Sequence, residues 1–293
     1  MSAPAQLGII GGSGLYALSS FSGEERLTVD TPFGPPSSEI VVGSLNGARV
    51  AFLSRHGPGH RLTPSEVPYA ANIYAMKSLG VTHLLSVSAV GSLRERLEPR
   101  SFCIPDNLID RTVGRQRSFF GDGVVAHVSM ADPFCGDFSA QLTAAARSAS
   151  SLPVHEGGSY VCIEGPQFST RAESELFRNW GASIIGMTAL PEARLAREAE
   201  ICYACLAMVT DYDVWHDSDE VSVELVIANL MAMTADVASI VENLAGSADE
   251  DCDSRCRASL DNAIITTHDQ IPPWAWERLG PITERYLSAN QRA

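Results

Sequence analysis

The sequence predicts an α/β fold, because short apolar runs alternate along the chain with segments whose apolar residues have helical spacing. The clearest example is 183–215, in which two apolar runs (183–186 and 205–209) enclose a helical segment. Pro191 and Glu192 suit the first turn of that helix, where a missing N–H is harmless and a carboxylate meets the positive end of the helix dipole. A strand, a helix and a strand in this order are typical of a parallel crossover unit.

Length and composition are those of a globular protein with a substantial core. The chain has 293 residues, enough for one large α/β domain or two smaller ones, and is 45% hydrophobic and 19% charged. Its formal net charge of −14 argues against nucleic acid or an anionic membrane as a partner, although a local pocket can still bind a small anion. The amino-terminal MSAPAQLGII has no basic region, and we see no apolar run near the ~18 residues that a membrane span needs. We therefore expect a soluble cytoplasmic protein.

The first predicted strand, 7–10, runs directly into a Gly-Gly-Ser-Gly sequence that contains Ser13. Glycines let a backbone approach a ligand closely, and their N–H groups together with a hydroxyl suit an anion. Residues 12–17 also match a form of the dinucleotide-binding fingerprint, with Asp30 at nearly the required distance. Asp30 precedes Thr-Pro-Phe-Gly, however, which predicts a turn and not a strand end that presents a carboxylate to a ribose.

Two further strands, 40–42 and 50–53, are predicted to pair through a turn at Asn46-Gly47, which is a strong hairpin signal. The second strand runs into Arg55 and His56 within a glycine-containing stretch. An arginine beside a histidine at a strand end suits a phosphate or carboxylate site. The same residues also fit an exposed polar loop.

The remaining elements follow from the same periodicities. Further strands are expected over 83–87, 102–104, 108–109 and 159–163, and helices over 69–79, 141–150, 172–180, 221–244 and 274–287. We expect residues 1–245 to form the domain core. The acidic segment and C-terminal helix of 246–293 are expected to pack on the same domain, since no interdomain linker is visible.

Six of the predicted strands are followed at once by small, hydroxyl-bearing or charged residues. This pattern indicates a single site built from many strand ends. Met187, Thr188, Asp211 and Asp213 would all lie there. Asp211 and Asp213 are two residues apart and would face the same side of an extended backbone. Taken alone, aspartates in such a place more often only end a strand and cap the next turn.

The seven cysteines are scattered, and most fit the role of small buried hydrophobic residues. Cys202 and Cys205 form a C-x-x-C pair, and Cys252 and Cys256 a C-x3-C pair, so a zinc site or disulfides are minor alternatives. Core packing is the simpler explanation for the first pair, which lies in an apolar run. Whether these four, or Cys135, form disulfides is left open.

The chain resembles the 5′-methylthioadenosine phosphorylases, of the trimeric purine nucleoside phosphorylase superfamily, in motifs that occur in order from about residue 7 to about residue 244. These motifs are GIIGGSGLY, DTPFG, SRHGPGH, SVSAVGSL, MADPFC, EGPQFSTRAE, GMTALPEA and VTDYDVW. The acidic, two-cysteine segment after Gly246 matches no motif of the family. The resemblance implies a single α/β domain with a mixed, partly barrel-like central β-sheet flanked by α-helices. It also implies a homotrimer, or a dimer of trimers, with active sites near subunit interfaces.

The reaction implied by the resemblance is phosphorolysis, in which phosphate attacks C1′ of the nucleoside and releases adenine and 5-methylthioribose 1-phosphate. No metal or organic cofactor is expected, because phosphate is a co-substrate. The resemblance assigns the phosphate site to Ser13, Arg55, His56, Ser88 and Thr188. A dianion needs convergent donors, and a guanidinium, hydroxyls and loop amides supply them.

The nucleoside site is assigned in the same way. Met187 would lie against the ribose, with Ala89 and Phe168 lining the pocket. Asp211 would hold the purine N7, and Asp213 would assist at the N7 and 6-amino edge. Both aspartates and His56 are expected to be catalytic, because the leaving purine gathers negative charge that a proton-sharing carboxyl can stabilise.

Two residues are assigned to the 5′ side of the nucleoside. His127 corresponds to a residue that the family contributes to the substrate of the neighbouring subunit. Val223 would fall in the hydrophobic wall of the 5′-thioether pocket.

Base specificity depends on Ser169 and Asp211. Relatives that act on inosine and guanosine carry Glu and Asn at these positions. A carboxylate only accepts hydrogen bonds from a base edge and therefore favours a 6-aminopurine. The chain also departs from the commoner family pattern, with Ser13 and Ser88 where Thr is frequent and Gly186 where Asn is frequent.

Three alternatives stay open. The chain could be a phosphorylase for another purine nucleoside, such as inosine or 5′-methylthioinosine, with a 6-oxopurine preference. It could be a hydrolytic nucleosidase, although Arg55 and His56 would then have no anion to bind. It could be an NAD-binding dehydrogenase or a nucleotide sensor based on residues 12–17, which would leave the other strand-end motifs unexplained.

Overall fold

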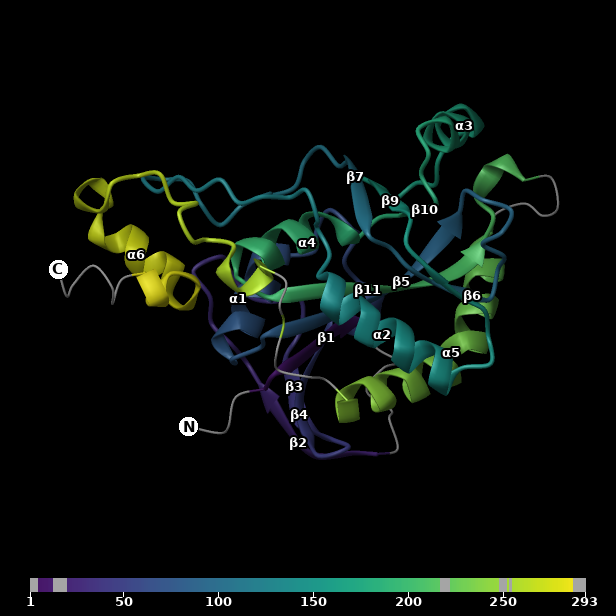
Figure 1. The fold of residues 1–293 in the computed structure, drawn as a ribbon, viewed down its shortest axis with the longest axis horizontal. Helices are drawn as coiled ribbons and strands as arrows, with labels where there is room; N and C mark the ends of the chain where they lie inside the picture. Colours follow the sequence, from purple (N-terminus) through teal and green to yellow (C-terminus); the bar gives the residue numbers. More distant parts are fainter. Residues whose placement is uncertain (1–4, 13–19, 217–221, 248–251, 253–254, 287–293) are drawn as a thin grey trace.

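The computed structural model describes the chain except for residues 1–4, 13–19, 217–221, 248–251, 253–254 and 287–293 (Figure 1). Its strands are β1 (Leu7–Gly11), β2 (Phe21–Leu27), β3 (Ile40–Leu45), β4 (Ala48–Ser54), β5 (His83–Ser92), β6 (Ser101–Ile104), β7 (Asn107–Arg111), β8 (Val154–Glu156), β9 (Ser159–Ile163), β10 (Ile184–Gly186) and β11 (Cys202–Asp211). Its helices are α1 (Tyr69–Ser78), α2 (Gly136–Ala149), α3 (Arg171–Asn179), α4 (Ala189–Glu198), α5 (Val223–Ser247) and α6 (Pro273–Leu279).

The strands form one mixed sheet that branches at β5. Its centre is parallel, because β1 lies between β4 and β5, and β11 pairs with the other edge of β5. The predicted hairpin is confirmed, since β3 and β4 pair antiparallel across Asn46 and Gly47. One arm continues through β10, β9 and β7, and the other through β6 and β8. A mixed sheet with helices on its faces confirms the predicted fold class.

The predicted parallel crossover over 183–215 is wrong. β10 pairs antiparallel with the end of β5, whereas β11 runs parallel to β5, so β10 and β11 have opposite directions. The local signals were correct, since α4 separates the two strands and Leu190 is extended (φ −121°, ψ 136°), so that the regular helix starts at Pro191. Strand direction depends on which edge of β5 each strand meets, and local apolar periodicity does not encode that choice.

Both of the long strands extend beyond their predicted ends. β5 continues to Ser92 because β11 and β10 pair with its last residues on its two edges. β11 continues to Asp211, with a register shift between Val209 and Asp211. The polar residues of these segments therefore belong to paired strands, which hold them more rigidly than loops would.

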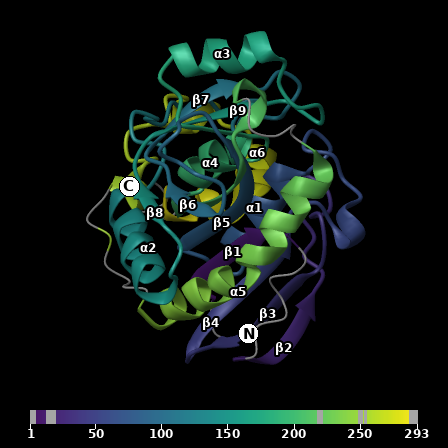
Figure 2. The same ribbon diagram turned by 90° about the vertical axis from the view of Figure 1, so that its right-hand side faces the viewer.

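Helices cover both faces of the sheet. α1 and α4 pack with Ile10 and Val209 in one core cluster, and α2 and α5 pack with Ile9 and Met208 in the other. This alternation along β1 and β11 is the period of two that a strand imposes. Figure 2 shows α2 and α5 lying side by side along one face, with α3 at the far edge of the molecule.

Residues 223–246 of helix α5 are long and apolar enough to cross a membrane, judged by length and composition alone. This differs from the expectation that no apolar run is long enough. The inner face of α5 packs in the core through Met233, Val237, Ile240 and Leu244. The other face is exposed, so that 22% of the segment's apolar window is buried within the described structure.

The C-terminal segment packs on the same core as the rest of the chain. Leu260, Ala263, Ala275 and Leu279 join the cluster that contains α1 and α4. The helix expected over 274–287 is shorter than predicted, because α6 ends at Gly280, whose φ of 40° a glycine adopts readily.

Candidate active site

A cavity of about 440 Å³ opens where β4, β5 and β11 end, beside β10 and the amino-terminal half of α5. Ten of the predicted site residues line it: Arg55, His56, Ser88, Ala89, Phe168, Ser169, Met187, Thr188, Asp211 and Asp213. Its size is that of a small-molecule site. Ser13 lies outside the described residues, but Gly12, which precedes it, lines the cavity. The predicted convergence of strand ends is therefore confirmed.

Two predicted site residues do not line this cavity. His127 is exposed on the segment that forms an isolated bridge between Ala126 and Ile264. Val223 is 58% exposed at the first position of α5, whereas Val226, Leu230, Thr234 and Val237 line the cavity. Val223 lies on the same helical face as Leu230, seven residues further on, so its place at the amino-terminal end of α5, and not the helical period, keeps it off this cavity. The expected role of Val223 in the apolar wall is thus taken by its neighbours.

Arg55 is held by a buried ion pair with Glu192. Its Nε donates to Glu192 Oε2 over 2.9 Å and its Nη2 to Glu192 Oε1 over 3.0 Å, and both side chains are about 2% exposed or less. Nη2 also donates to Ser86 Oγ (2.8 Å) and Nη1 to the carbonyl of Val87 (3.0 Å). Burial opposes the charged form, but Glu192 holds the pKa of Arg55 above its ordinary value. Within the described residues Nη1 has this single acceptor, so its second hydrogen is available to an anion.

His56 is a neutral side chain at physiological pH. Burial lowers the pKa of His56 to about 4. Its Nδ1 lies 2.9 Å from the carbonyl of Leu62, so Nδ1 carries the hydrogen and Nε2 is an acceptor. The ring stacks on His60, whose centroid is 4.1 Å away and which also lines the cavity. His56 therefore suits the O–H of a hydrogen phosphate better than a fully ionised anion.

Ser88 and Thr188 supply hydroxyls from β5 and from the residue that precedes α4, and both are at most 9% exposed. The Tyr160 hydroxyl lies beside them and influences the same part of the site. It is fully buried and has no hydrogen bond of ordinary geometry within the described residues, although the amide of Thr188 and the hydroxyl of Ser88 lie close enough to act on it. Burial raises the pKa of Tyr160, so the hydroxyl keeps its proton.

Asp211 and Asp213 form a buried carboxyl pair, and burial raises the pKa of both above the ordinary value. Thr210 Oγ1 donates to Asp211 Oδ2, and the amide of Asp213 donates to Asp211 Oδ1, each over 2.8 Å. Oδ2 of Asp213 is buried and has no hydrogen-bond partner among the described residues. One carboxyl is therefore fixed in orientation, while the other presents an acceptor that a ligand can use.

The two aspartates meet for a different reason than expected. Asp213 does not continue an extended backbone, because its φ is 55° and it begins a short 3-10 helix. The chain turns back there and brings both side chains to one cavity wall.

Gly91 of β5 lies between β10 and β11, where residues of both strands reach the cavity. It is paired with Ile185 of β10 on one edge and with Asp211 of β11 on the other. A Cβ on Gly91 would lie 2.9 Å from Asp211 Oδ1 and 3.1 Å from Ile185 Cγ2. The absence of a side chain lets the two flanking strands bring Met187, Thr188 and Asp211 together.

Sequence reasoning missed several residues that shape the site. The sequence predicts Glu192 only as part of a helix terminus, yet Glu192 pairs with Arg55 and accepts a hydrogen bond from Tyr203 over 2.9 Å. Tyr160 and Ser86 were read as strand residues. The apolar residues on both sides of Glu192 are a usable sequence signal that it will be buried, and Glu is almost never fully buried without a partner. No sequence signal marked Tyr160.

Within the described residues, the side chains that line this cavity form no group close enough to hold a metal ion together. Among those residues, the group of histidine, cysteine and acidic side chains that could hold an ion is a set of four cysteines elsewhere in the fold.

The chain belongs to the Phosphorylase superfamily, whose sequence profile matches residues 6–245. A relative from Chloroflexus aurantiacus, an S-methyl-5′-thioadenosine phosphorylase, is 55% identical over 97% of this chain and 99% of its own length. The crystal structure of a methylthioadenosine phosphorylase from an antarctic soil metagenomic library is 49% identical, with a TM-score of 0.92 over 96% of this chain and 99% of its own.

A third similar protein was crystallised with a ligand. A single-residue mutant of the adenosine/methylthioadenosine phosphorylase from Schistosoma mansoni, in complex with methylthioadenosine, is 38% identical. Its TM-score is 0.77 over 84% of this chain and 93% of its own. These comparisons confirm the family resemblance read from the motifs.

Proposed function

We propose that this protein catalyses the phosphorolysis of 5′-methylthioadenosine to adenine and 5-methylthioribose 1-phosphate. The observation that carries the proposal is one cavity that holds both the donors of Arg55, Ser88 and Thr188 and the buried carboxyls of Asp211 and Asp213. The first set suits an oxyanion and the second suits a purine edge. The names of the relatives and the ligand of the Schistosoma mansoni structure support the same reaction.

Phosphate would bind at the end of the cavity formed by Arg55, His56, Ser88 and Thr188. The guanidinium charge is already balanced by Glu192, so the hydroxyls and the available Nη1 hydrogen would orient the nucleophile without trapping it in a strong ion pair. His56 Nε2 would accept a hydrogen bond from the O–H of hydrogen phosphate and so turn an unprotonated oxygen toward C1′.

Adenine would leave toward Asp211 and Asp213. As the glycosidic bond lengthens, negative charge develops on the purine, and a protonated Asp211 would share its proton with N7. The unpartnered Oδ2 of Asp213 would accept from the 6-amino group. The buried Oγ of Ser169 also has no partner among the described residues and lies on the same cavity, where it can serve the base.

The 5′ substituent would meet an apolar wall. Met208, Val226, Leu230 and Val237 line this part of the cavity, and a methylthio group loses less hydration there than the 5′-hydroxyl of adenosine. This favours 5′-methylthioadenosine over adenosine.

The homotrimer implied by the family resemblance belongs to the same proposal. The outer face of α5 exposes Val223, Ile227 and Met231 next to the cavity, an apolar surface that a second subunit would cover. His127, exposed and outside this cavity, would then reach a neighbour's substrate. No cofactor takes part, and phosphate is the co-substrate. A cytoplasmic location fits the thiol state of all seven cysteines.

The test is release of adenine from 5′-methylthioadenosine by the purified protein, with and without inorganic phosphate, beside adenosine and inosine. We expect strict phosphate dependence and preference for 5′-methylthioadenosine. Cleavage without phosphate would identify a hydrolase and remove the roles of Arg55, His56 and Thr188.

If inosine is the preferred substrate, the reaction is still phosphorolysis, but the roles assigned to Asp211 and Ser169 are wrong. The double variant Asp211→Asn with Ser169→Glu tests these roles directly, since it should shift activity toward 6-oxopurines. No gain with inosine from this variant would contradict the assignment of the base site.

A further inference from the structure

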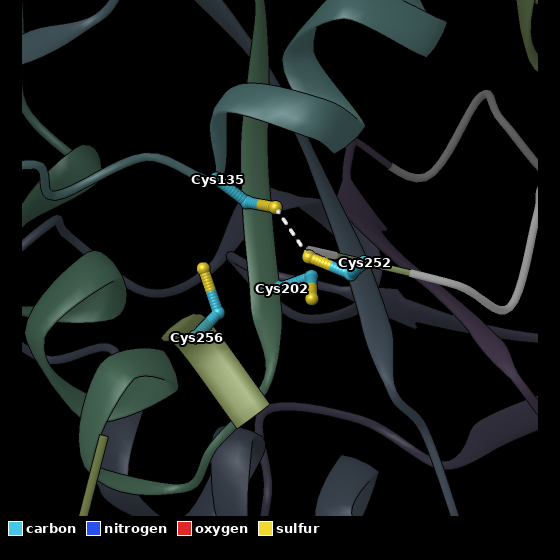
Figure 3. Close-up of side chains that lie close together, drawn as sticks. All are labelled: Cys135, Cys202, Cys252 and Cys256. Carbon is cyan, nitrogen blue, oxygen red and sulfur yellow. Dashed lines mark hydrogen bonds between the residues drawn. The ribbon is translucent and has the colours of Figure 1, made fainter. Parts of the chain in front are cut away.

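Four cysteines from three separate segments converge on the α2 and α5 side of the sheet, away from the cavity (Figure 3). Cys135 immediately precedes α2, Cys202 is the first residue of β11, and Cys252 and Cys256 come from the segment after α5. Their sulfur atoms all lie within 4.8 Å of one another. Residues as far apart in sequence as 135 and 256 thus meet at one point.

The four sulfur atoms are close enough together to bind a single metal ion. A tetrahedral site with Zn–S bonds of about 2.3 Å has sulfurs about 3.8 Å apart. The Sγ atoms of Cys135 and Cys252 are 3.2 Å apart, and the others lie within the 4.8 Å limit. Cys135, Cys202 and Cys256 are buried and Cys252 is half-buried. A metal ion could therefore enter the cluster from the side of Cys252. None of these residues forms a disulfide.

The cluster is not the C-x-x-C pair that the sequence offers. Cys202 and Cys205 face opposite sides of β11, because three residues along a strand is an odd number of steps. Cys205 instead lies 3.8 Å from Ser88 Oγ. Only Cys202 of that pair joins Cys135, Cys252 and Cys256.

Two neighbours of the cluster favour thiolates and one opposes them. Cys135 is the N-cap of α2, and its sulfur accepts from the amide of Phe138 over 3.5 Å, so it lies at the positive end of a helix. Lys77 lies close enough to interact electrostatically with Cys202. The opposing group is Asp137, which accepts from Cys252 over 3.5 Å and sits at the half-buried edge.

We propose that Cys135, Cys202, Cys252 and Cys256 bind one zinc ion as a structural four-thiolate site. Zinc would displace one proton from each thiol, so that Zn²⁺ and four S–H groups give a tetrathiolate complex and four released protons. The ion would fasten the segment after α5 to β11 and to the start of α2. The site lies at the opposite end of β11 from Asp211, about 30 Å along a ten-residue strand, and so takes no part in the reaction.

Zinc content tests the proposal directly and does not depend on the proposed reaction. The full chain is purified without added chelator under reducing conditions, and zinc is measured by elemental analysis beside the variants Cys252→Ala and Cys256→Ala. The matched control is Cys103→Ala, which removes a fully buried thiol outside the cluster. We expect one zinc per chain in the wild type and the control, and at least a tenfold loss in the two cluster variants.

Cobalt substitution identifies the ligands even if a variant folds poorly. Metal-free wild-type protein titrated with Co²⁺ should show thiolate-to-cobalt charge transfer and the intense d–d bands of tetrahedral coordination, saturating at one equivalent. Zinc should abolish these bands and raise the melting temperature. Zinc-free protein that also fails to bind Co²⁺ would overturn the proposal. So would disulfides between these cysteines in protein isolated without air.

Discussion

The hydroxyl of Tyr160 occupies the space that a side chain at position 186 would need. A Cβ built on Gly186 would overlap the Tyr160 oxygen and lie 2.7 Å from its Cζ atom. The two residues lie on the paired strands β9 and β10, where Tyr160 is in register with Ile184, two residues before Gly186, at the wall that carries Ser88 and Thr188. The absence of a side chain at Gly186 therefore leaves room for the Tyr160 hydroxyl, which supplies the polar group at this wall.

Gly186→Ala should lower the free energy of unfolding by about 1–3 kcal/mol, because the new methyl group must displace a buried ring. In a Tyr160→Leu background, which lacks the overlapping atoms, the same substitution should cost clearly less. Urea unfolding of the four proteins measures this coupling. Gly136→Ala is the control, since nothing lies within 4 Å of its added Cβ. Equal costs in both backgrounds would contradict the steric relationship.

Glu192→Gln should lower the free energy of unfolding by about 3–5 kcal/mol, because it leaves the buried charge of Arg55 without its partner. The exposed pair of Arg147 and Glu156 provides the control, and Glu156→Gln should cost at most about 1 kcal/mol. Inorganic phosphate should raise the melting temperature of Glu192→Gln more than that of the wild type, since the anion can replace the lost carboxylate. If phosphate stabilises neither protein, Arg55 does not face an anion site.

Asp211→Asn should lower kcat/KM for 5′-methylthioadenosine by about 10²- to 10⁴-fold, because the amide cannot transfer a proton to N7. Burial raises the pKa of Asp211, so the wild-type rate should fall as the pH rises through that pKa and the carboxyl loses its proton. In the variant, this fall in rate with rising pH should be absent. Asp269→Asn, on an exposed short helix, should retain both rate and profile. An unchanged profile in Asp211→Asn would assign the proton to another group.

Glu198 should make stability depend on pH near neutrality. Burial raises its pKa to about 7, despite hydrogen bonds that it accepts from Ser118 Oγ and the amide of Phe119. The folded state therefore binds the proton more tightly than the unfolded state, and this contribution is complete below about pH 4.5 and is lost as the pH rises to 7. In Glu198→Gln, the free energy of unfolding measured with urea should change less between pH 4.5 and pH 7 than in the wild type, by about 1–3 kcal/mol. A parallel decline in the variant would assign the pH dependence to other groups.

The residues that line the cavity could largely be predicted from the sequence, because the family motifs that contain them lie at or near the ends of recognisable strands. Arg55 follows β4, Ser88 lies within β5, and Asp211 ends β11. Parallel strands deliver such residues to one edge of a sheet. The partners of these residues could not be predicted. Glu192 is 137 residues from Arg55 in sequence, and no local pattern links them.

The sequence by itself determined the α/β class, the positions of most strands and helices, and the chemistry of the two ends of the cavity, because periodicity and residue type are local properties of the chain. Only the tertiary structure decided that β10 runs antiparallel to β5, that Val226 and not Val223 lines the cavity, and that Cys135 joins Cys202. These facts depend on which distant segments become neighbours. Long-range packing of the whole core fixes that choice, and it is not encoded in any short stretch of residues.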